Sequence, residues 1–237
     1  MTAAAFIPAR AHSTRLLNKN TRLVAGVPLV VRAVQVARQA QAIGLVGEVW
    51  VDVEDGVTEK LALGAGATVR WRHCDLRAPE TRVVDLVRHW LGGGEDAYGH
   101  VLDPMLDLVC VLLPTSPLRT LRHLVESRLL LDDAAEGVMS VTPYRQDTAY
   151  ALTTLPDGTL ATRFDPKEVR PSFQHDTAHD GTVLWVRSSA LLGLPPEANF
   201  YGLKLRPYRV PPEESVDVNT ERDLVVAEAL IDSKGTR

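Results

Sequence analysis

Short apolar runs alternate along this chain with longer stretches in which apolar residues recur at helical spacing. Five runs are of strand type: Ala3–Ala9, Glu48–Val53, Thr68–Trp71, Asp107–Leu113 and Gly137–Val141. Helical spacing occurs in a stretch that begins at Pro28 and then over Val57–Ala65, Thr81–Leu91 and Leu121–Leu131. This alternation predicts an α/β fold with a doubly wound, mostly parallel sheet that binds ligands at the carboxyl ends of its strands.

The pattern changes after Pro143. Two β-rich runs, Tyr150–Thr154 and Thr159–Phe164, flank the turn sequence Pro156-Asp157-Gly158 and predict a hairpin. The polar stretch 165–180 reads as a loop. Further elements are expected as a strand at Thr182–Val186, a short helix near Leu191, an extended stretch to Val210 and a last helix over Glu221–Ile231. We expect one domain over residues 1–237, in which residues 145–180 form an insertion that covers the acceptor site or makes a dimer contact.

Composition narrows the class of protein. The 237 residues are 45% hydrophobic, which suits one large α/β domain, and the net charge of −4 argues against a general nucleic-acid-binding role. The sequence has neither a signal segment nor a run of 18 apolar residues, so we expect a cytoplasmic protein without membrane contact. The two cysteines, Cys74 and Cys110, match no zinc motif and are expected to be reduced and mostly buried.

Charge is distributed unevenly along the chain. The stretch 10–22 follows the first predicted strand and carries four cations and no acid: Arg10, Arg15, Lys19 and Arg22. The stretch 213–223 carries five acids against Arg222 alone. A cationic loop after a strand can surround a triphosphate with backbone N–H groups and fixed positive side chains. The acidic stretch suits a divalent metal ion beside those phosphates.

Four segments resemble the signatures of the acylneuraminate cytidylyltransferases, also called CMP-sialic acid synthetases. They are IPARAHSTRLLNKN at 7–20, GATVRWRHCDL at 66–76, LLPTSPLRT at 112–120 and ESVDVNTERDL at 214–224. The resemblance implies a Rossmann-like nucleotidyltransferase fold, usually in a homodimer. It also implies a reaction that couples CTP to a sialic-acid-like 2-keto-3-deoxy sugar acid, releases pyrophosphate and gives a CMP-sugar. The cofactor implied is Mg²⁺, with Mn²⁺ as a substitute.

The resemblance also implies residue roles. The catalytic residues expected are Arg10, Lys19 and Asp217, and the metal ligands expected are Asp217 and Asn219, which share one face of an extended segment. Expected nucleotide contacts are Ala9, Arg10, Ser13, Arg15, Asn20 and Arg72. Expected acceptor contacts are Thr115, Ser116, Arg119, Arg170, His179 and Asp180, with Arg170 suited to a sugar carboxylate. Attack of an anomeric hydroxyl on the α-phosphorus needs the triphosphate held and the charge on the leaving pyrophosphate offset.

Departures from the family pattern leave alternatives open. Ala11, His12 and Thr14 replace residues of the family's phosphate loop, and Asn219 replaces its second metal-site aspartate. The sugar-side segment QHDTAHDGTVLWV at 174–186 is closer to the pseudaminic acid branch. One alternative is transfer to another acceptor or from another nucleotide, and a second is nucleotide binding with weak or no turnover. This segment also contains a cluster of four polar residues: His175, Asp176, His179 and Asp180. Three interpretations of the cluster stay open, namely a transition-metal site, an acceptor-lining loop and a solvated loop.

Overall fold

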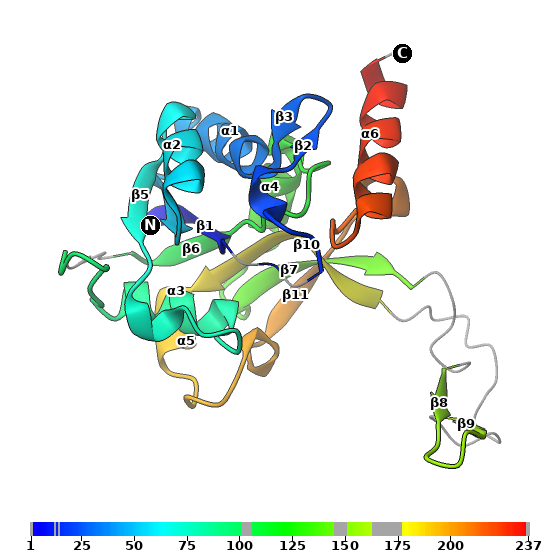
Figure 1. Cartoon of the computed structure of the whole chain (residues 1–237). Helices are drawn as coiled ribbons and strands as arrows, with labels where there is room; N and C mark the ends of the chain where they lie inside the picture. The colour runs from blue at the N-terminus through cyan, green and yellow to red at the C-terminus, as the bar shows by residue number, and fades with distance from the viewer. Residues whose placement is uncertain are drawn as a thin grey trace.

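A seven-stranded sheet with helices on both faces forms the body of the protein (Figure 1). The computed structural model describes residues 2–11, 13, 15–100, 106–144, 151–162 and 177–235. The strands lie in the order β11-β7-β10-β6-β1-β4-β5. Their bounds are β1 (Ala3–Ala9), β4 (Glu48–Val53), β5 (Thr68–Trp71), β6 (Leu108–Val111), β7 (Gly137–Pro143), β10 (Thr177–Arg187) and β11 (Leu205–Arg209).

The strand order reverses at β1, and this reversal positions the site. β1 pairs in parallel with β4 on one side and with β6 on the other, so the chain leaves β1 in one direction and later returns on the opposite side. In a doubly wound sheet, this switch point opens a crevice beyond the carboxyl ends of the two strands. All seven residues of β1, AAAFIPA, are buried, as expected for a central parallel strand covered on both faces.

Two hydrophobic cores separate the helices by sheet face. α1 (Leu29–Ala42), α2 (Gly56–Gly64) and α4 (Leu121–Leu129) cover one face, and α3 (Val83–Leu91) and α5 (Ser188–Leu192) cover the other (Figure 1). Asp55 begins α2 by accepting hydrogen bonds from Val57 N (2.9 Å) and Thr58 N (2.8 Å). Gly66, at φ +90°, follows the end of that helix, as its sequence position predicts.

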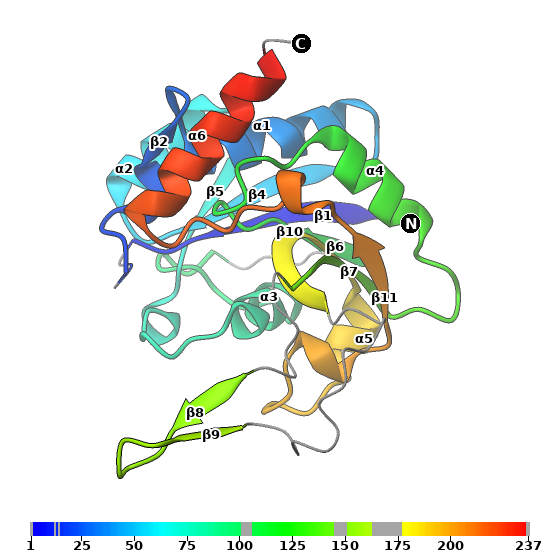
Figure 2. The same cartoon turned by 90° about the vertical axis from the view of Figure 1, so that its right-hand side faces the viewer.

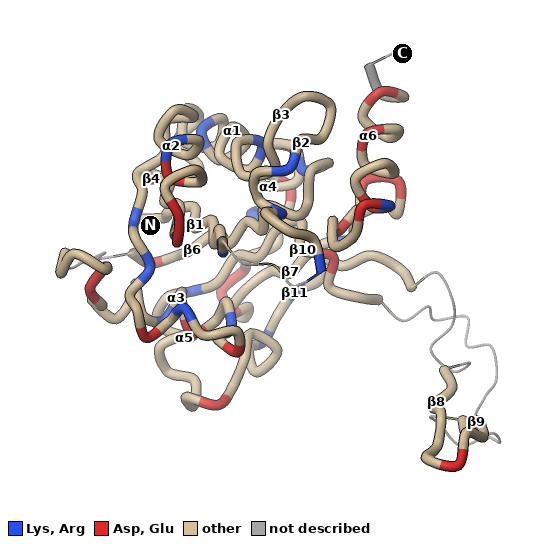
Figure 3. Tube along the Cα trace, viewed as in Figure 1, with Lys and Arg blue, Asp and Glu red and all other residues tan. Residues whose placement is uncertain are grey.

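The C-terminal helix α6 (Glu221–Gly235) packs against the cationic stretch 10–22 and the region that follows it. That region includes a small hairpin, β2 (Leu23–Val24) with β3 (Val27–Pro28), which the sequence pattern did not predict. A third hydrophobic cluster joins residues 16–29 to residues 218–227: Leu16, Val24, Leu29, Val218, Leu224 and Ala227. Arg22 also donates to both carboxylate oxygens of Glu221, at 2.5 and 2.6 Å. The basic start and the acidic end of the chain therefore meet, and Figure 3 shows the acidic positions along α6.

Most predicted elements are confirmed, among them the strand Thr182–Val186, which lies within β10. The polar loop expected up to Asp180 is wrong at its end, because β10 already starts at Thr177 and His179 and Asp180 are strand residues. β10 runs antiparallel to both neighbours and separates β6 from β7. The predicted hairpin is confirmed as β8 (Leu152–Thr154) and β9 (Leu160–Thr162), which stand away from the body in Figures 1 and 2.

Shorter elements complete the described chain: the 3₁₀ helices η1 (Lys19–Thr21), η2 (Cys74–Leu76), η4 (Phe200–Gly202) and η5 (Pro212–Glu214). Both cysteines are free; Cys110 is buried in β6, but Cys74 is exposed on η2, contrary to the prediction of buried thiols. Among the described residues, every helix is too short or too polar to cross a membrane.

Candidate active site

A cavity of about 330 Å³ opens where β1 and β6 end, at the switch point of the sheet. Its walls come from the phosphate-loop sequence, the start of α3, the loop after β6 and the segment before α6. The lining residues are Pro8, Arg10, Ser13, Arg15, Lys19, Asn20, Arg72, Thr81, Val83, Leu86, Leu113, Pro114, Thr115, Asp217 and Asn219. The sequence therefore predicted most of the charged residues that the fold brings together here.

Local hydrogen bonds shape the loop after β1. Asn20 Nδ2 donates to the carbonyl of Arg10 at 2.8 Å, which ties the end of the loop back to its beginning. Leu16 N donates to Ser13 Oγ at 3.4 Å. Asn20 is buried and lines the cavity together with Ser13, Arg15 and Lys19. The neutral side chains of this loop therefore fix its backbone, and its cations lie at the same cavity.

A buried ion-pair network supports the opposite wall. Arg72, only 2% exposed, donates from Nε to Asp52 Oδ1 at 2.5 Å and from Nη1 to Glu54 Oε1. Asp52 also accepts the indole N–H of Trp90 at 3.1 Å. Glu54 accepts the backbone N–H of Ala11 at 2.9 Å, so the network reaches the loop itself. Arg72 therefore holds the wall of the cavity in place as well as lining it.

The segment before α6 reaches the site through one main-chain bond and one polar chain. Val218 N donates to the carbonyl of Thr115 at 2.8 Å, which joins the segment to the loop after β6. Lys19 Nζ lies 3.2 Å from Asn219 Oδ1, and Asn219 Nδ2 lies 2.6 Å from Asp217 Oδ2. Burial lowers the pKa of Lys19, with nearby Asp217 opposing that shift. The expected catalytic pair Lys19 and Asp217 is therefore linked through Asn219.

Asp223 lies in the first turn of α6. Its Oδ2 accepts the backbone N–H groups of Asn219 (2.9 Å) and Thr220 (2.8 Å) and the Thr220 hydroxyl (2.9 Å). These bonds fix the turn that carries Asn219 and satisfy free N–H groups at the helix start. Asp223 is thus a helix-start residue that shapes the site from outside the cavity.

Two residues predicted to face the site lie elsewhere. Arg119 is 5% exposed and donates to the carbonyls of Thr182, Leu113 (2.6 Å) and Gly181 (3.1 Å). Burial lowers its pKa to about 10. Ser116 is also buried, and neither side chain lines the cavity, whereas Thr115 does. Arg119 therefore joins the loop after β6 to β10. Ala9 is the fully buried last residue of β1, one position before the cavity-lining Arg10.

His179 and Asp180 lie on β10, whose register against β7 shifts between His179 and Leu184. Asp180 accepts the backbone N–H (3.1 Å) and hydroxyl (2.7 Å) of Thr182, so its carboxylate is committed to its own strand. Burial lowers the pKa of His179, and the charges of Asp180 and Asp217 oppose the shift. The negative charge of Asp217 therefore acts on the pKa of His179. Other candidates lie outside the described residues: His12, Thr14, Arg170, His175 and Asp176.

Sequence reasoning missed several residues of this region. Thr81, Val83 and Leu86 give the cavity a partly apolar wall, and Asp52 with Glu54 fixes Arg72. The signal available for Asp52 was a carboxylate inside the otherwise apolar strand Glu48–Val53, because a fully buried acid needs a partner.

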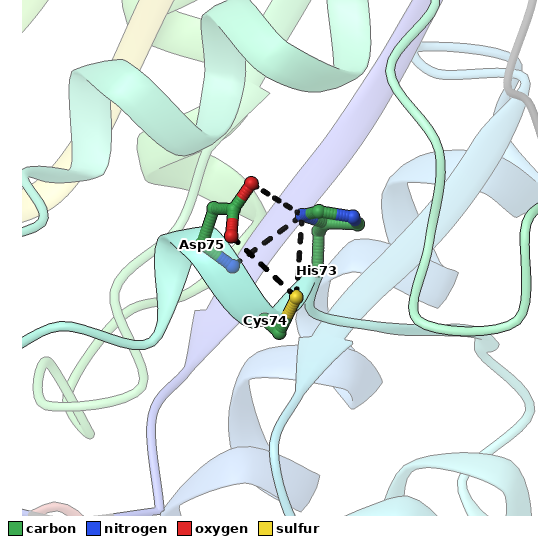
Figure 4. A group of neighbouring side chains, drawn as sticks. All are labelled: His73, Cys74 and Asp75. Carbon is green, nitrogen blue, oxygen red and sulfur yellow. Dashed lines mark hydrogen bonds and ion pairs between the residues drawn. The ribbon is translucent and has the colours of Figure 1, made fainter.

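Three adjacent side chains next to Arg72 form a small polar group, shown in Figure 4. Their donor atoms lie within 4.8 Å of one another. His73 Nδ1 accepts the backbone N–H of Asp75 at 3.4 Å, and Cys74 Sγ lies 3.6 Å from Asp75 Oδ1. Cys74 and Asp75 are exposed and stand outside the cavity lining. The group therefore caps η2 at its first turn.

Known proteins resemble this chain in sequence. The sequence model of the cytidylyltransferase family matches residues 4–111. CMP-N,N'-diacetyllegionaminic acid synthase of Legionella pneumophila is 28% identical over 244 residues, which cover 98% of this chain and 97% of that synthase. N-acylneuraminate cytidylyltransferase of Oncorhynchus mykiss is 27% identical over 238 residues, which cover 96% of this chain but 50% of that longer protein. The predicted resemblance to cytidylyltransferases is confirmed.

Solved structures share the fold. The structure of CMP:2-keto-3-deoxy-manno-octonic acid synthetase complexed with CTP gives a TM-score of 0.71 at 17% identity and covers 99% of this chain and 100% of that one. The 4-diphosphocytidyl-2C-methyl-D-erythritol synthase of Anaerococcus prevotii gives a TM-score of 0.62 at 11% identity, with 98% of each chain covered. The predicted Rossmann-like nucleotidyltransferase fold is confirmed.

Proposed function

We propose that this chain is a cytidylyltransferase that couples CTP to a 2-keto-3-deoxy sugar acid, releasing pyrophosphate and forming a CMP-sugar. The observation that carries the proposal is the meeting of the cationic loop after β1 with Asp217 at the switch point of the sheet. The relatives named for CMP-sugar synthesis support the substrate class, because they match nearly the whole of this chain. The fold supplies the scaffold, and the proposal rests on the side chains that it brings together.

The charged lining suits the binding of a triphosphate. Arg10, Arg15 and Lys19 present three positive charges on one loop, which would hold the phosphates and offset charge that builds on the leaving pyrophosphate. Lys19 is half-buried, and desolvation strengthens its interaction with an anion. Thr81, Val83 and Leu86 give an apolar wall for the nucleoside. The anomeric hydroxyl of the acceptor would then attack the α-phosphorus from the open side, with pyrophosphate leaving toward the cations.

A divalent ion, Mg²⁺ or Mn²⁺, fits this proposal through Asp217. Hard cations of this kind use oxygen ligands and keep phosphate oxygens and water in their shell, so one protein carboxylate is a sufficient anchor. When bound, the ion would offset negative charge on the phosphates. Asp217 would hold it, with Asn219 beside it on the same segment. Lys19 would remain on the loop side and bind the phosphates directly.

The acceptor side is proposed to lie toward β10, where His179 stands within reach of the charge of Asp217. His179 is half-buried and neutral at neutral pH because burial lowers its pKa. A neutral imidazole can hydrogen-bond to a hydroxyl of a sugar without adding charge. We propose that His179, with Thr115, orients the acceptor, and that Arg170 and the rest of 145–180 contribute to its cover.

The apolar face of the β8–β9 hairpin supports a homodimer. Leu152 is 56% exposed and Leu160 is 65% exposed on the same face of a two-stranded hairpin that is too small to be stable alone in water. We propose that residues 1–237 form a single domain and that a second copy of the chain covers this face of the hairpin. Sedimentation velocity should give a dimer for the wild type and a monomer for the double substitution Leu152→Asp, Leu160→Asp. A variant that remains dimeric would overturn this assignment.

The reaction is tested by pyrophosphate release from CTP, ATP, GTP and UTP, each with a panel of acceptors. The panel contains several 2-keto-3-deoxy sugar acids and, as matched controls, neutral sugars of the same size. Release with CTP and a keto sugar acid supports the proposal. Release with another nucleotide or another acceptor would indicate that the enzyme transfers a different nucleotidyl group or uses a different acceptor. The altered segment 174–186 is the reason to test this alternative. Binding of CTP without release under any metal condition would indicate a nucleotide-binding protein without turnover.

A further inference from the structure

The hydrogen bonds around Asn219 determine how its amide is turned. Lys19 Nζ lies 3.2 Å from Asn219 Oδ1, and Asn219 Nδ2 lies 2.6 Å from Asp217 Oδ2. An ammonium group only donates and a carboxylate only accepts, so the oxygen must face Lys19 and the NH₂ group must face Asp217. The reversed amide would lose both bonds. The side-chain oxygen of Asn219, through which its amide would ligate a metal ion, therefore accepts a hydrogen bond from Lys19.

The two carboxylates that follow Asp217 are also engaged, and Glu221 accepts both of its hydrogen bonds from Arg22. Asp223 Oδ2 accepts three hydrogen bonds from Asn219 and Thr220, and Asp223 does not line the cavity. Among the described lining residues, Asp217 is the one carboxylate. A metal ion that enters without a nucleotide would therefore find a single anionic ligand from the protein. Water would have to supply the rest of its shell.

Charge around the cavity disfavours such an ion further. In the described lining, Arg10, Arg15 and Lys19 are positively charged against Asp217, while the charge of Arg72 is offset by Asp52 and Glu54. A divalent cation at Asp217 would be repelled by this loop, since charges a few ångströms apart interact strongly where water is partly excluded. A bound triphosphate carries enough negative charge to reverse the sign of the potential and adds oxygen ligands of its own.

We propose that Asn219 is a positioning residue that bridges Lys19 to Asp217 and makes divalent-metal binding depend on the nucleotide. The metal ion then binds together with the triphosphate, and the site without a nucleotide binds it only weakly. This inference rests on the proposed function. The neutral amide keeps Asp217 beside the phosphate loop without adding the second negative charge that would hold an ion permanently. Asn219→Asp would supply that charge and create a site that binds metal alone.

The test measures metal binding directly and needs no turnover. Mn²⁺ is titrated into wild-type protein, Asn219→Asp and Asn219→Ala, with free Mn²⁺ read from its paramagnetic resonance signal. Each titration is run alone and with cytidine 5′-(α,β-methylene)triphosphate, which binds as a triphosphate but cannot transfer its CMP group. A titration of the analogue without protein gives the Mn²⁺ that it binds in solution, and this amount is subtracted. Asn219→Ala is the matched control, because it breaks the bridge without adding charge. Asp217→Asn reports whether the ion counted is at this site.

The expected result is at least tenfold tighter Mn²⁺ binding to the wild type with the analogue than without it. Without the analogue, Asn219→Asp should bind Mn²⁺ at least tenfold more tightly than the wild type, and Asn219→Ala should not. Wild-type protein that binds Mn²⁺ alone as tightly as with the analogue would overturn the inference, and that comparison decides even if Asn219→Asp fails to fold. Failure of the analogue itself to bind would instead count against the proposed function, while the comparison of variants without nucleotide still tests Asn219.

Discussion

The two halves of the central sheet handle charge in different ways. On the side of β1, β4 and β5, cations converge on one cavity, and a buried network of Asp52, Glu54 and Arg72 fixes its wall. On the side of β10 and β7, the polar residues near the cavity are committed to the fold, as Asp180 is to Thr182 and Arg119 to three carbonyls. The family model covers residues 4–111, the first of these halves.

Under the proposed function, phosphate binding and acceptor recognition fall to different halves of the sheet. The first half carries Arg10, Arg15 and Lys19, whose charges suit a triphosphate. In the second half, His179 is the described residue that we propose for acceptor binding together with Thr115. Substitutions in the two halves should therefore change different kinetic constants.

The largest effect is expected at the meeting point of the two charges. Asp217→Ala or Lys19→Ala should lower kcat/KM for pyrophosphate release by about 10³-fold, because each removes charge stabilisation in a partly dry site. Initial rates with CTP and the best acceptor measure the effect. Asp133→Ala, which removes an exposed acid from a turn, is the control and should leave the rate unchanged. Rates within threefold of wild type for both site variants would remove them from the proposed catalytic set.

The wall of the cavity is predicted to matter for stability as well as for binding. Arg72→Met should destabilise the protein by about 3–5 kcal/mol, because Asp52 would be left buried without its charged partner. Urea unfolding gives this value from the shift in midpoint at constant slope. Arg38→Met removes an exposed arginine from α1 and should cost no more than about 0.5 kcal/mol. An equal cost for the two substitutions would contradict a supporting role for the network.

The acceptor half is tested by His179→Ala. We expect KM for the acceptor to rise about tenfold while KM for CTP stays within twofold, because a lost hydrogen bond to a neutral group costs on the order of 1 kcal/mol. The CTP constant, measured on the same samples, serves as the internal control. A matched rise in both constants would show that His179 supports the whole cavity, and the separation of the two halves would then fail.

The smallest effect is a pH dependence of stability from His123, which is fully buried on α4. Its Nδ1 accepts the N–H of Thr120 at 3.2 Å and its Nε2 lies 2.8 Å from Glu214 Oε2. Burial lowers the pKa of His123 below 6.5, with Glu214 opposing and Arg122 and Arg119 adding to the shift; the ring of Tyr208 packs edge-on against it. A depressed histidine pKa means that the unfolded chain binds the proton more readily than the folded one.

The stability from neutral His123 is therefore complete above pH 6.5 and is lost as pH falls through the lowered folded pKa. Thermal unfolding between pH 7.5 and 5.5 should show a midpoint that falls by no more than about 4 °C for this contribution. His123→Gln keeps both hydrogen-bonding directions but does not titrate, so its midpoint should change less over the same range. Equal slopes for the two proteins would exclude His123 as the source.

Sequence reasoning succeeded where local pattern decides structure. The all-buried run of β1 and the capped helix α2 were readable because their signals lie within a few residues. The insertion of β10 between β6 and β7 was not, because strand order is set by packing between distant segments. The polar start of β10, which pairs Thr177 with Pro143 at the end of β7, also hides its strand character.

The same limit explains the site. Arg10, Lys19 and Asp217 were predicted because their motifs are specific, and the fold brings them to one cavity. Arg119 was expected to face a substrate, yet it caps carbonyl groups, and a guanidinium in a motif looks the same in both roles. The orientation of the Asn219 side-chain amide is set by Lys19 and Asp217 together, and these two residues are 198 positions apart in the chain. Such relations appear only in three dimensions.

The most direct measurement is pyrophosphate release from the four nucleoside triphosphates with a 2-keto-3-deoxy sugar acid and Mg²⁺. The proposed function predicts release with CTP at a rate at least a hundredfold above that with ATP, GTP or UTP, and its loss in Asp217→Ala. Equal release from all four nucleotides, or continued release in Asp217→Ala, would contradict the assignment of this cavity as the site of a cytidylyltransferase.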